Sequence, residues 1–168
     1  MRRLSLALAA ACVLVSACSK PADLKQVLQV TELSGGYYDA GVVDGRNKLL
    51  PSLTFRIKKS TEDSLRPLSL NVAFKQLPKP GTAVAPGQPA ETDFDEVYKQ
   101  SVTFTGDQTD LLTIRATAGY TGDPPQSRAD MLKHSMFQDM RVHVFAKHSA
   151  SQWVEVAVFD LPRQILTQ

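Results

Sequence analysis

Hydrophobic and polar residues alternate with a period of two along much of the chain, which is the pattern of β-strands with one buried face. The clearest alternation lies between residues 49 and 77, where two apolar series occur: Leu53, Phe55 and Ile57, then Leu68, Leu70, Val72 and Phe74. The polar residues 60–67 join the two runs. We therefore predict that the runs pair as a β-hairpin, with one face in the core and one in solvent.

Shorter segments of the same kind precede and follow this pair. At the start, Gly35-Gly36 is expected to break the chain between two strands, and Asp44-Gly45 to form a turn after the second. The further expected strands cover residues 25–33, 37–43, 97–104, 112–118, 140–147 and 153–159.

Two segments do not fit the strand pattern. Residues 78–91 contain four prolines and two glycines, so we expect a long loop at one end of the domain. Ser127 is a potential helix cap with Asp130 three residues later, which predicts one short helix that ends near Gln138.

Short strands, frequent turns and one small helix predict an all-β fold. We expect an immunoglobulin-like antiparallel β-sandwich of about seven strands over residues 25–163, followed by a loose tail at 164–168. Residues 53–74, a strand, a polar bend and a second strand ending in an aromatic residue, resemble the first hairpin of FxLYD-type immunoglobulin-like domains of bacterial surface proteins. The resemblance implies a scaffolding or binding module and carries over no functional residue.

The first residues have the composition of an export signal. Arg2 and Arg3 are followed by an uncharged apolar run, residues 4–17, which is shorter than the roughly 20 residues that cross a bilayer. The run ends in Val15-Ser16-Ala17-Cys18, which resembles the lipobox of bacterial lipoproteins. The resemblance implies that residues 1–17 are removed and that Cys18 is lipidated. An uncleaved anchor, or a plain signal with an accidental cysteine, is the alternative.

Lipidation implies a location in the bacterial cell envelope. Ser19 follows the cysteine where inner-membrane lipoproteins often carry Asp, so the resemblance favours the periplasmic face of the outer membrane. Residues 18–24 would form a tether of at most about 25 Å. The domain would then lie close to its membrane, where an envelope protein is the expected partner.

Charge and cysteine content exclude several other classes. The chain has 19 Lys and Arg against 17 Asp and Glu, and loss of Arg2 and Arg3 with the signal leaves a mature chain without net charge. Nothing in this balance indicates a nucleic-acid partner. Cys12 lies in the signal and Cys18 would be acylated, so the mature body has no cysteine for a disulfide or a thiolate metal site.

No catalytic or metal-binding motif stands out, and we predict neither an enzyme nor a cofactor. His143 and His148 are five residues apart and would face opposite sides of one strand, while His134 belongs to the predicted helix. All three are expected at the surface or the rim. Asp93, Asp95 and Glu96 lack the glycine and the downstream carboxylate of a calcium loop, and we interpret them as solvated.

Four aromatic residues are the candidate binding groups: Tyr37, Tyr38, Tyr120 and Trp153. Packing in the core or in a strand is the alternative for each, and it is favoured for Trp153. Tyr120 lies among glycines and prolines and is the one most expected to be exposed. The main hypothesis is a lipid-anchored binding or scaffolding module. A carrier with an apolar cavity between the sheets or under the helix is the alternative, and an enzyme acting on envelope polymers ranks last.

Overall fold

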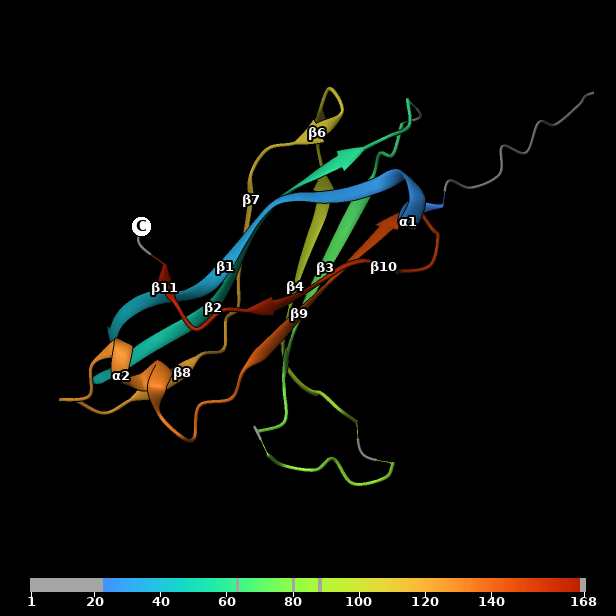
Figure 1. Cartoon of the computed structure of the whole chain (residues 1–168). Helices are drawn as coiled ribbons and strands as arrows, with labels where there is room; N and C mark the ends of the chain where they lie inside the picture. Colours follow the sequence, from blue (N-terminus) through green and yellow to red (C-terminus); the bar gives the residue numbers. More distant parts are fainter. Residues whose placement is uncertain (1–22, 63, 80, 88, 167–168) are drawn as a thin grey trace, which may run out of the picture.

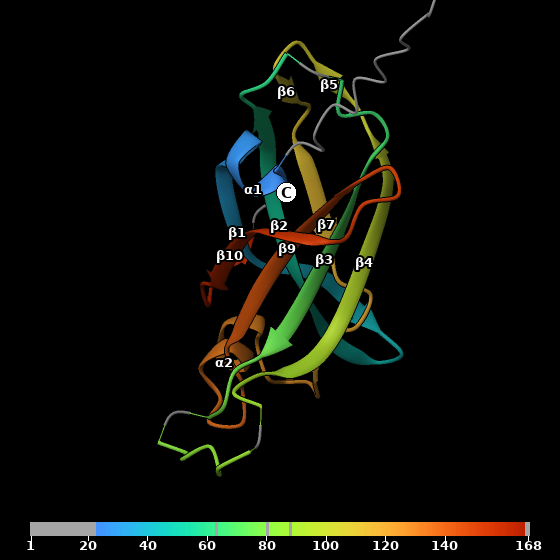
Figure 2. The ribbon, with the colours of Figure 1, turned by 90° about the vertical axis from the view of Figure 1, so that its right-hand side faces the viewer.

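Two β-sheets packed face to face form the body of the molecule (Figure 1). The computed structural model describes residues 23–166 except 63, 80 and 88. The first sheet contains β1 (Leu28–Val43), β2 (Arg46–Lys59), β5 (Phe104–Thr105), β6 (Gln108–Thr109), β7 (Leu112–Arg115), β8 (Tyr120–Gly122) and β11 (Ile165–Leu166). The second contains β3 (Leu68–Gln76), β4 (Thr92–Val102), β9 (Met140–His148) and β10 (Val154–Leu161), in the order β10-β9-β3-β4 (Figure 2). The predicted sandwich-like, largely β architecture is confirmed, with more strands than the seven expected.

The predicted hairpin of residues 49–77 is wrong, because its two strands lie in different sheets. β2 pairs with β1 on one side and with β7 and β8 on the other, whereas β3 pairs with β4 and β9. The connection at residues 60–67 therefore crosses from one sheet to the other. Phe55 of β2 and Phe74 of β3 are both fully buried, on the two sides of the same core. The alternation identified the buried faces correctly, but not the partner of each strand.

The chain does not break at Gly35-Gly36, and β1 continues through both glycines. A side chain at Gly36 would put its Cβ 2.7 Å from the backbone oxygen of Gln164, because the C-terminal segment crosses β1 here. Tyr37 donates its backbone N–H to that oxygen (2.8 Å), and β11 then pairs with β1 in parallel. The expected loose tail is thus wrong for residues 164–166, and residues 167–168 lie outside the described part.

The described residues contain two short helices instead of one. α2 (Arg128–Lys133) begins at the predicted cap, where the Ser127 side chain accepts from the backbone N–H of Asp130, but it ends before Gln138 because His134 is extended. α1 (Leu24–Val27) was not expected, and its buried Leu24 shows that the predicted tether ends inside the folded domain. Within residues 23–166, neither helix is long and apolar enough to span a membrane.

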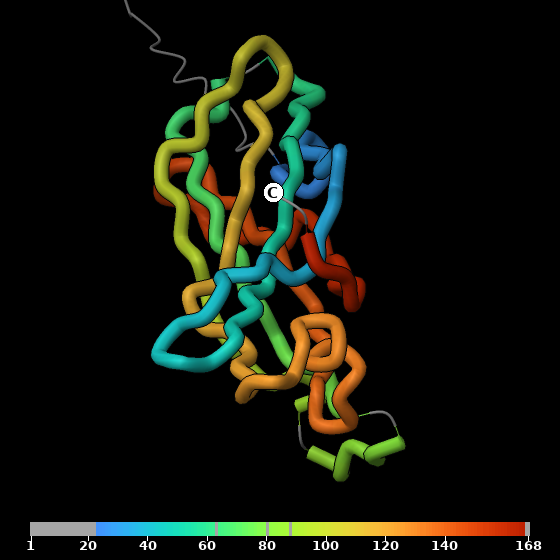
Figure 3. The backbone as a smooth tube through the Cα atoms, turned by 90° about the vertical axis from the view of Figure 1, so that its left-hand side faces the viewer, coloured from blue at the N-terminus to red at the C-terminus, as the bar shows by residue number. Residues whose placement is uncertain are grey.

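The two ends of the sandwich carry different elements. Asp23 and α1 lie at the end where β2 finishes, since the backbone N–H of Ser60 donates to Val27 (2.9 Å). β8 and α2 lie at the other end, where β8 pairs with the first residues of β2 (Figures 1 and 3). β2 has 14 residues and spans about 45 Å at ~3.3 Å per residue. The long loop predicted at residues 78–91 is confirmed where it is described, and it leaves the α2 end.

The turn predicted at Asp44-Gly45 is confirmed. Both residues have positive φ, 51° and 77°, as a two-residue type I′ hairpin turn requires. This turn joins β1 to β2 at the α2 end of the molecule. It therefore places Arg46, the first residue of β2, at the α2 end, where this residue lines a pocket.

Candidate functional site

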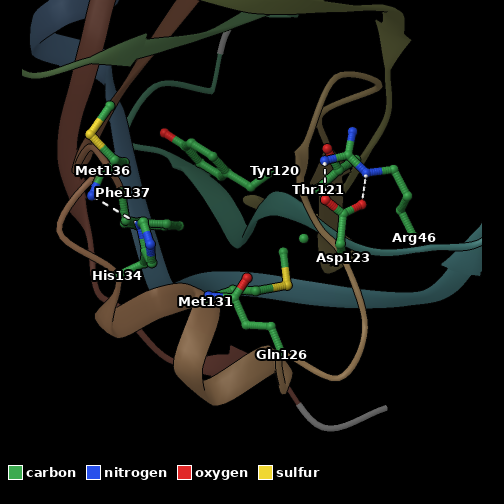
Figure 4. A pocket seen from close by; sticks show the side chains of 10 residues that line it. Arg46, Tyr120, Thr121, Asp123, Gln126, Met131, His134, Met136 and Phe137 are labelled. Carbon is green, nitrogen blue, oxygen red and sulfur yellow. Dashed lines mark hydrogen bonds and ion pairs between the residues drawn. The ribbon is translucent and has the colours of Figure 1, made fainter.

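A pocket of about 260 Å³ opens at the α2 end of the sandwich (Figure 4). Its walls come from the start of β2, from β8, from the segment that follows β8, and from α2 with the residues after it. The lining residues are Arg46, Tyr120, Thr121, Gly122, Asp123, Gln126, Met131, His134, Met136 and Phe137. The pocket is therefore built mainly from one continuous stretch, residues 120–137, and is completed by Arg46 from a distant part of the sequence.

One rim of the pocket is charged and hydrogen bonded. The Arg46 Nε donates to Asp123 Oδ1 at 2.7 Å, and both side chains are largely exposed. Next to them, the buried Asn47 donates its Nδ2 to the backbone oxygen of Gln126 at 2.6 Å. These two contacts hold the segment after β8 against the beginning of β2.

The inner wall of the pocket is aromatic. Tyr120 packs against Phe137, with ring centroids 4.4 Å apart, and stacks on Phe94 at 5.6 Å. Its hydroxyl donates to the backbone oxygen of Gln138 (2.8 Å) and accepts from Gln76 Nε2 (3.1 Å). Burial raises the pKa of Tyr120, so this phenol stays protonated near neutral pH. Tyr120 is consequently a half-buried structural group and not the exposed loop residue that the sequence suggested.

Tyr37 belongs to the same aromatic cluster and is completely buried. Its ring meets Phe137 edge to face, with centroids 5.1 Å apart, and burial raises its pKa well above the usual range. Its hydroxyl has no hydrogen-bond partner among the described residues. The prediction that Tyr37 serves as a surface binding residue is therefore wrong, and the alternative of core packing holds.

The opposite rim carries sulfur and imidazole groups. Met131 is buried and packs directly against Gly122, whereas Met136 is 63% exposed. His134 is exposed as expected, and its Nδ1 accepts from the backbone N–H of Met136 at 3.1 Å. Within the described part of the chain, no three His, Cys, Asp or Glu side chains come together in a way that could hold a metal ion. The pocket offers apolar contacts, sulfur atoms and a charged rim, which suits binding of an exposed side chain or peptide segment.

The other sequence-predicted residues lie away from this pocket. Tyr38 is half-buried on the first sheet, where the Arg115 guanidinium lies 3.4 Å from its ring centroid. Trp153 lies just before β10, is 38% exposed, and meets the exposed Tyr98 edge to face at 5.7 Å. Packing in the core or in a strand, the alternative favoured for Trp153, is therefore wrong. Cys18 lies outside the described residues.

A charged cluster on the outer face of the second sheet was missed by the sequence analysis. His143 lies between two carboxylates, with Nε2 2.8 Å from Glu91 and Nδ1 2.9 Å from Glu155. Arg141 contacts Glu91 at 3.1 Å and also pairs with Asp160, and hydrogen bonds from Arg141 hold the pKa of Asp160 below its usual value. Cross-strand pairing of β9 with β10 explains the Glu155 and Asp160 contacts. Glu91 lies at the end of a loop, so no strand pairing could have predicted its contacts with His143 and Arg141.

Asp95 was interpreted as a solvated loop residue, and the structure corrects this. It lies in β4, and its Oδ2 accepts from the backbone N–H of Thr117 (2.6 Å), from the Thr117 hydroxyl (2.9 Å) and from the N–H of Ala118 (3.0 Å). Burial alone would raise the pKa of Asp95, but these bonds and one from Glu96 hold it below its ordinary value. Asp95 thus joins the edge of the second sheet to the segment between β7 and β8.

No protein-family model matches this chain, and no similar curated protein or solved structure was found.

Proposed function

We propose that this protein is a lipid-anchored envelope module that binds another envelope protein through the pocket at its α2 end. The observation that carries this proposal is the position of the pocket relative to the entry of the chain. Asp23 lies at the α1 end, and Arg46 on the pocket rim begins the strand that runs from one end to the other. An anchor at Cys18 would therefore hold the pocket away from the membrane, within reach of periplasmic partners.

The lining of the pocket supports binding in preference to chemistry. Asp123 is engaged by Arg46, and the phenol of Tyr120 is committed to Gln138 and Gln76. Met136 presents an exposed thioether beside the aromatic wall, and its sulfur accepts a hydrogen bond from Lys79 Nζ at 3.4 Å. Thioether and aromatic groups next to a polar rim are typical of protein-binding surfaces.

The strand order supports the immunoglobulin-like assignment. In immunoglobulin domains, strands A, B and E share one sheet and strands C, F and G the other. Here β1, β2 and β7 are neighbours in the first sheet, and β3, β9 and β10 are neighbours in the second. Such domains use the loops at the ends of the sandwich for recognition, which agrees with a pocket at the α2 end.

Site-specific crosslinking in intact cells tests the proposal. A photoreactive phenylalanine analogue replaces Met136 at the pocket rim or Leu111, which is 50% exposed near β6 at the opposite end. We expect a discrete adduct with another envelope protein from position 136 and none from position 111. Adducts of the protein with itself only, or equal adducts from both positions, would contradict the proposal.

The anchor is tested separately. Cys18→Ala should abolish acylation. In a detergent phase-partitioning assay, the variant should move from the detergent-rich phase to the aqueous phase, because the acyl chains supply the membrane affinity. A matched Cys12→Ala variant changes the other cysteine, within the apolar run, and should be lipidated normally. Mass spectrometry of the mature N-terminus decides the question, and an unmodified N-terminus in the unsubstituted protein refutes the anchor.

One observation favours the alternative function, a carrier of apolar cargo. A hollow of about 460 Å³ lies between α2 and β11 and is lined by Ala129, Leu132, Lys133, Arg163 and Ile165. Its volume falls in the range of small-molecule sites, roughly 300–1,000 Å³. Extraction of the purified protein followed by lipid mass spectrometry tests this function. A stoichiometric bound lipid would support the carrier, and its absence would exclude it.

A further inference from the structure

An exposed aromatic pair lies on the outer face of the second sheet. Tyr98 of β4 is 52% exposed and Trp153 is 38% exposed, and their rings meet edge to face. The ammonium of Lys147 lies 5.7 Å from the centroid of the Trp153 ring. Two large aromatic side chains with a neighbouring cation on an open surface contribute little to the core, so their exposure requires another explanation.

This aromatic pair lies toward the end of the molecule where the chain enters. The turn between β9 and β10 leads directly to Trp153, and the backbone N–H of Ser149 in that turn donates to Pro67 at 3.1 Å. Pro67 ends the 60–67 connection, whose first residue, Ser60, is bonded to Val27 of α1. α1, this connection and the β9–β10 turn therefore share the end opposite α2 (Figure 2).

The length of the preceding chain limits how far this end can lie from an anchor. Five peptide units separate Cys18 from Asp23, and they reach at most about 18 Å. A domain joined to a membrane anchor by so short a segment keeps its α1 end next to the headgroup layer of the bilayer. Tryptophan and tyrosine favour that layer, because the ring enters the upper acyl region while the polar group stays hydrated. A lysine beside them can pair with lipid phosphate.

We propose that Trp153 and Tyr98, together with Lys147, form a second, non-covalent contact of this protein with the phospholipid surface. The inference rests on the proposed function, because it takes the lipid at Cys18 as the first contact. Two contacts fix an orientation that one flexible tether cannot. The outer face of β4 and β9 turns toward the bilayer at the α1 end, and the pocket at the α2 end points away from it.

The chain contains a single tryptophan, so its fluorescence reports on this surface alone. The lipidated full-length mature protein is reconstituted into phosphatidylethanolamine–phosphatidylglycerol vesicles, with or without bromine on the upper acyl carbons. We expect brominated lipid to quench roughly half of the Trp153 emission, because an interfacial ring contacts those carbons. The control is the Trp153→Phe, Met136→Trp double variant. It moves the reporter to an exposed position at the α2 end, where we expect no quenching.

Flotation of the same vesicles separates the two possible failures. Protein that floats with the vesicles but shows no quenching overturns the aromatic contact and leaves the anchor intact; the aromatic pair is then available to a protein partner instead. Protein that does not float refutes the anchor, and the inference fails with it. Equal quenching in the unsubstituted protein and in the double variant also overturns the inference, since it places both ends at the bilayer.

Discussion

Replacing Asp95 by Asn should measure how strongly the two sheets are joined at the β4 edge. Three hydrogen bonds converge on Asp95 Oδ2, from two backbone N–H groups and the Thr117 hydroxyl, and Oδ1 accepts a fourth from Glu96. Hydrogen bonds to a charged acceptor contribute about 1.5–3 kcal/mol each when they are well shielded. Asp95 is partly exposed, and Asn can keep the bonds to its single oxygen. We therefore expect a loss of about 2 kcal/mol in the free energy of unfolding near neutral pH.

Urea unfolding followed by circular dichroism measures this loss, with Asp93→Asn as the matched control. Asp93 lies on the same strand, but its side chain is 85% exposed and forms an ion pair with Lys75 at 3.2 Å. Exposed ion pairs contribute roughly 0–1 kcal/mol, so the control should lose less than half as much as Asp95→Asn. Equal losses in the two variants would show that the Asp95 bonds do not hold the sheets together.

The pH dependence gives a second check. The folded-state pKa of Asp95 lies below the unfolded value, which is about 3.9 for Asp. The contribution of Asp95 to the free energy of unfolding is therefore fully present above its pKa in the unfolded state. This contribution is lost as the pH falls through its pKa in the folded state. We expect the difference between the unsubstituted protein and Asp95→Asn to be constant from about pH 5 to pH 8 and to shrink below about pH 4. A difference that stays constant into strong acid would refute the assignment.

Two further substitutions test the crossing at Gly36 and the hydrogen bonds of Tyr120 by the same unfolding assay. Gly36→Ala should lower the free energy of unfolding by about 1–3 kcal/mol, because its Cβ would meet the backbone oxygen of Gln164 at 2.7 Å. The control is Ser34→Ala, at an exposed position of the same strand. An unchanged stability of the Gly36→Ala protein would disprove the close crossing. Tyr120→Phe should lower the free energy of unfolding by about 1 kcal/mol, because it removes the hydrogen bonds to Gln138 and Gln76. The control Tyr98→Phe should leave the free energy of unfolding almost unchanged. Equal effects of the two substitutions would contradict the structural role of Tyr120 in the inner wall.

Periodicity predicted the strands well and their neighbours poorly, for a physical reason. A period of two tells which side chains face the core, and Leu53, Phe55, Leu70 and Phe74 are all fully buried as expected. It contains no information about which strand lies beside which, because both sheets of a sandwich cover the same core. The polar residues 60–67 can close a hairpin or cross between sheets, and the sequence pattern is the same in both cases.

The interpretation of glycine residues was the other source of error in the predicted strand boundaries. At Asp44-Gly45 the positive φ values of a tight turn explain the glycine, and the prediction succeeded. At Gly35-Gly36 the reason lies 129 residues away in sequence, where Gln164 Nε2 donates to the Gly35 oxygen at 2.7 Å. A glycine required by the close approach of a distant segment looks identical, in sequence, to a glycine that ends a strand.

For the candidate binding residues, the neighbouring sequence likewise did not predict which side chains are exposed. Glycines and prolines around Tyr120 indicated an irregular backbone correctly, but its ring packs inward on Phe137. Trp153 was expected to pack in the core or in a strand, yet it precedes β10 and its exposed ring contacts Tyr98. Exposure is decided by the elements that cover a residue. The proposed bilayer contact lies toward the α1 end of the sandwich, and the proposed binding pocket lies at the α2 end. One molecule can therefore make both proposed contacts at the same time, and neither needs to displace the other.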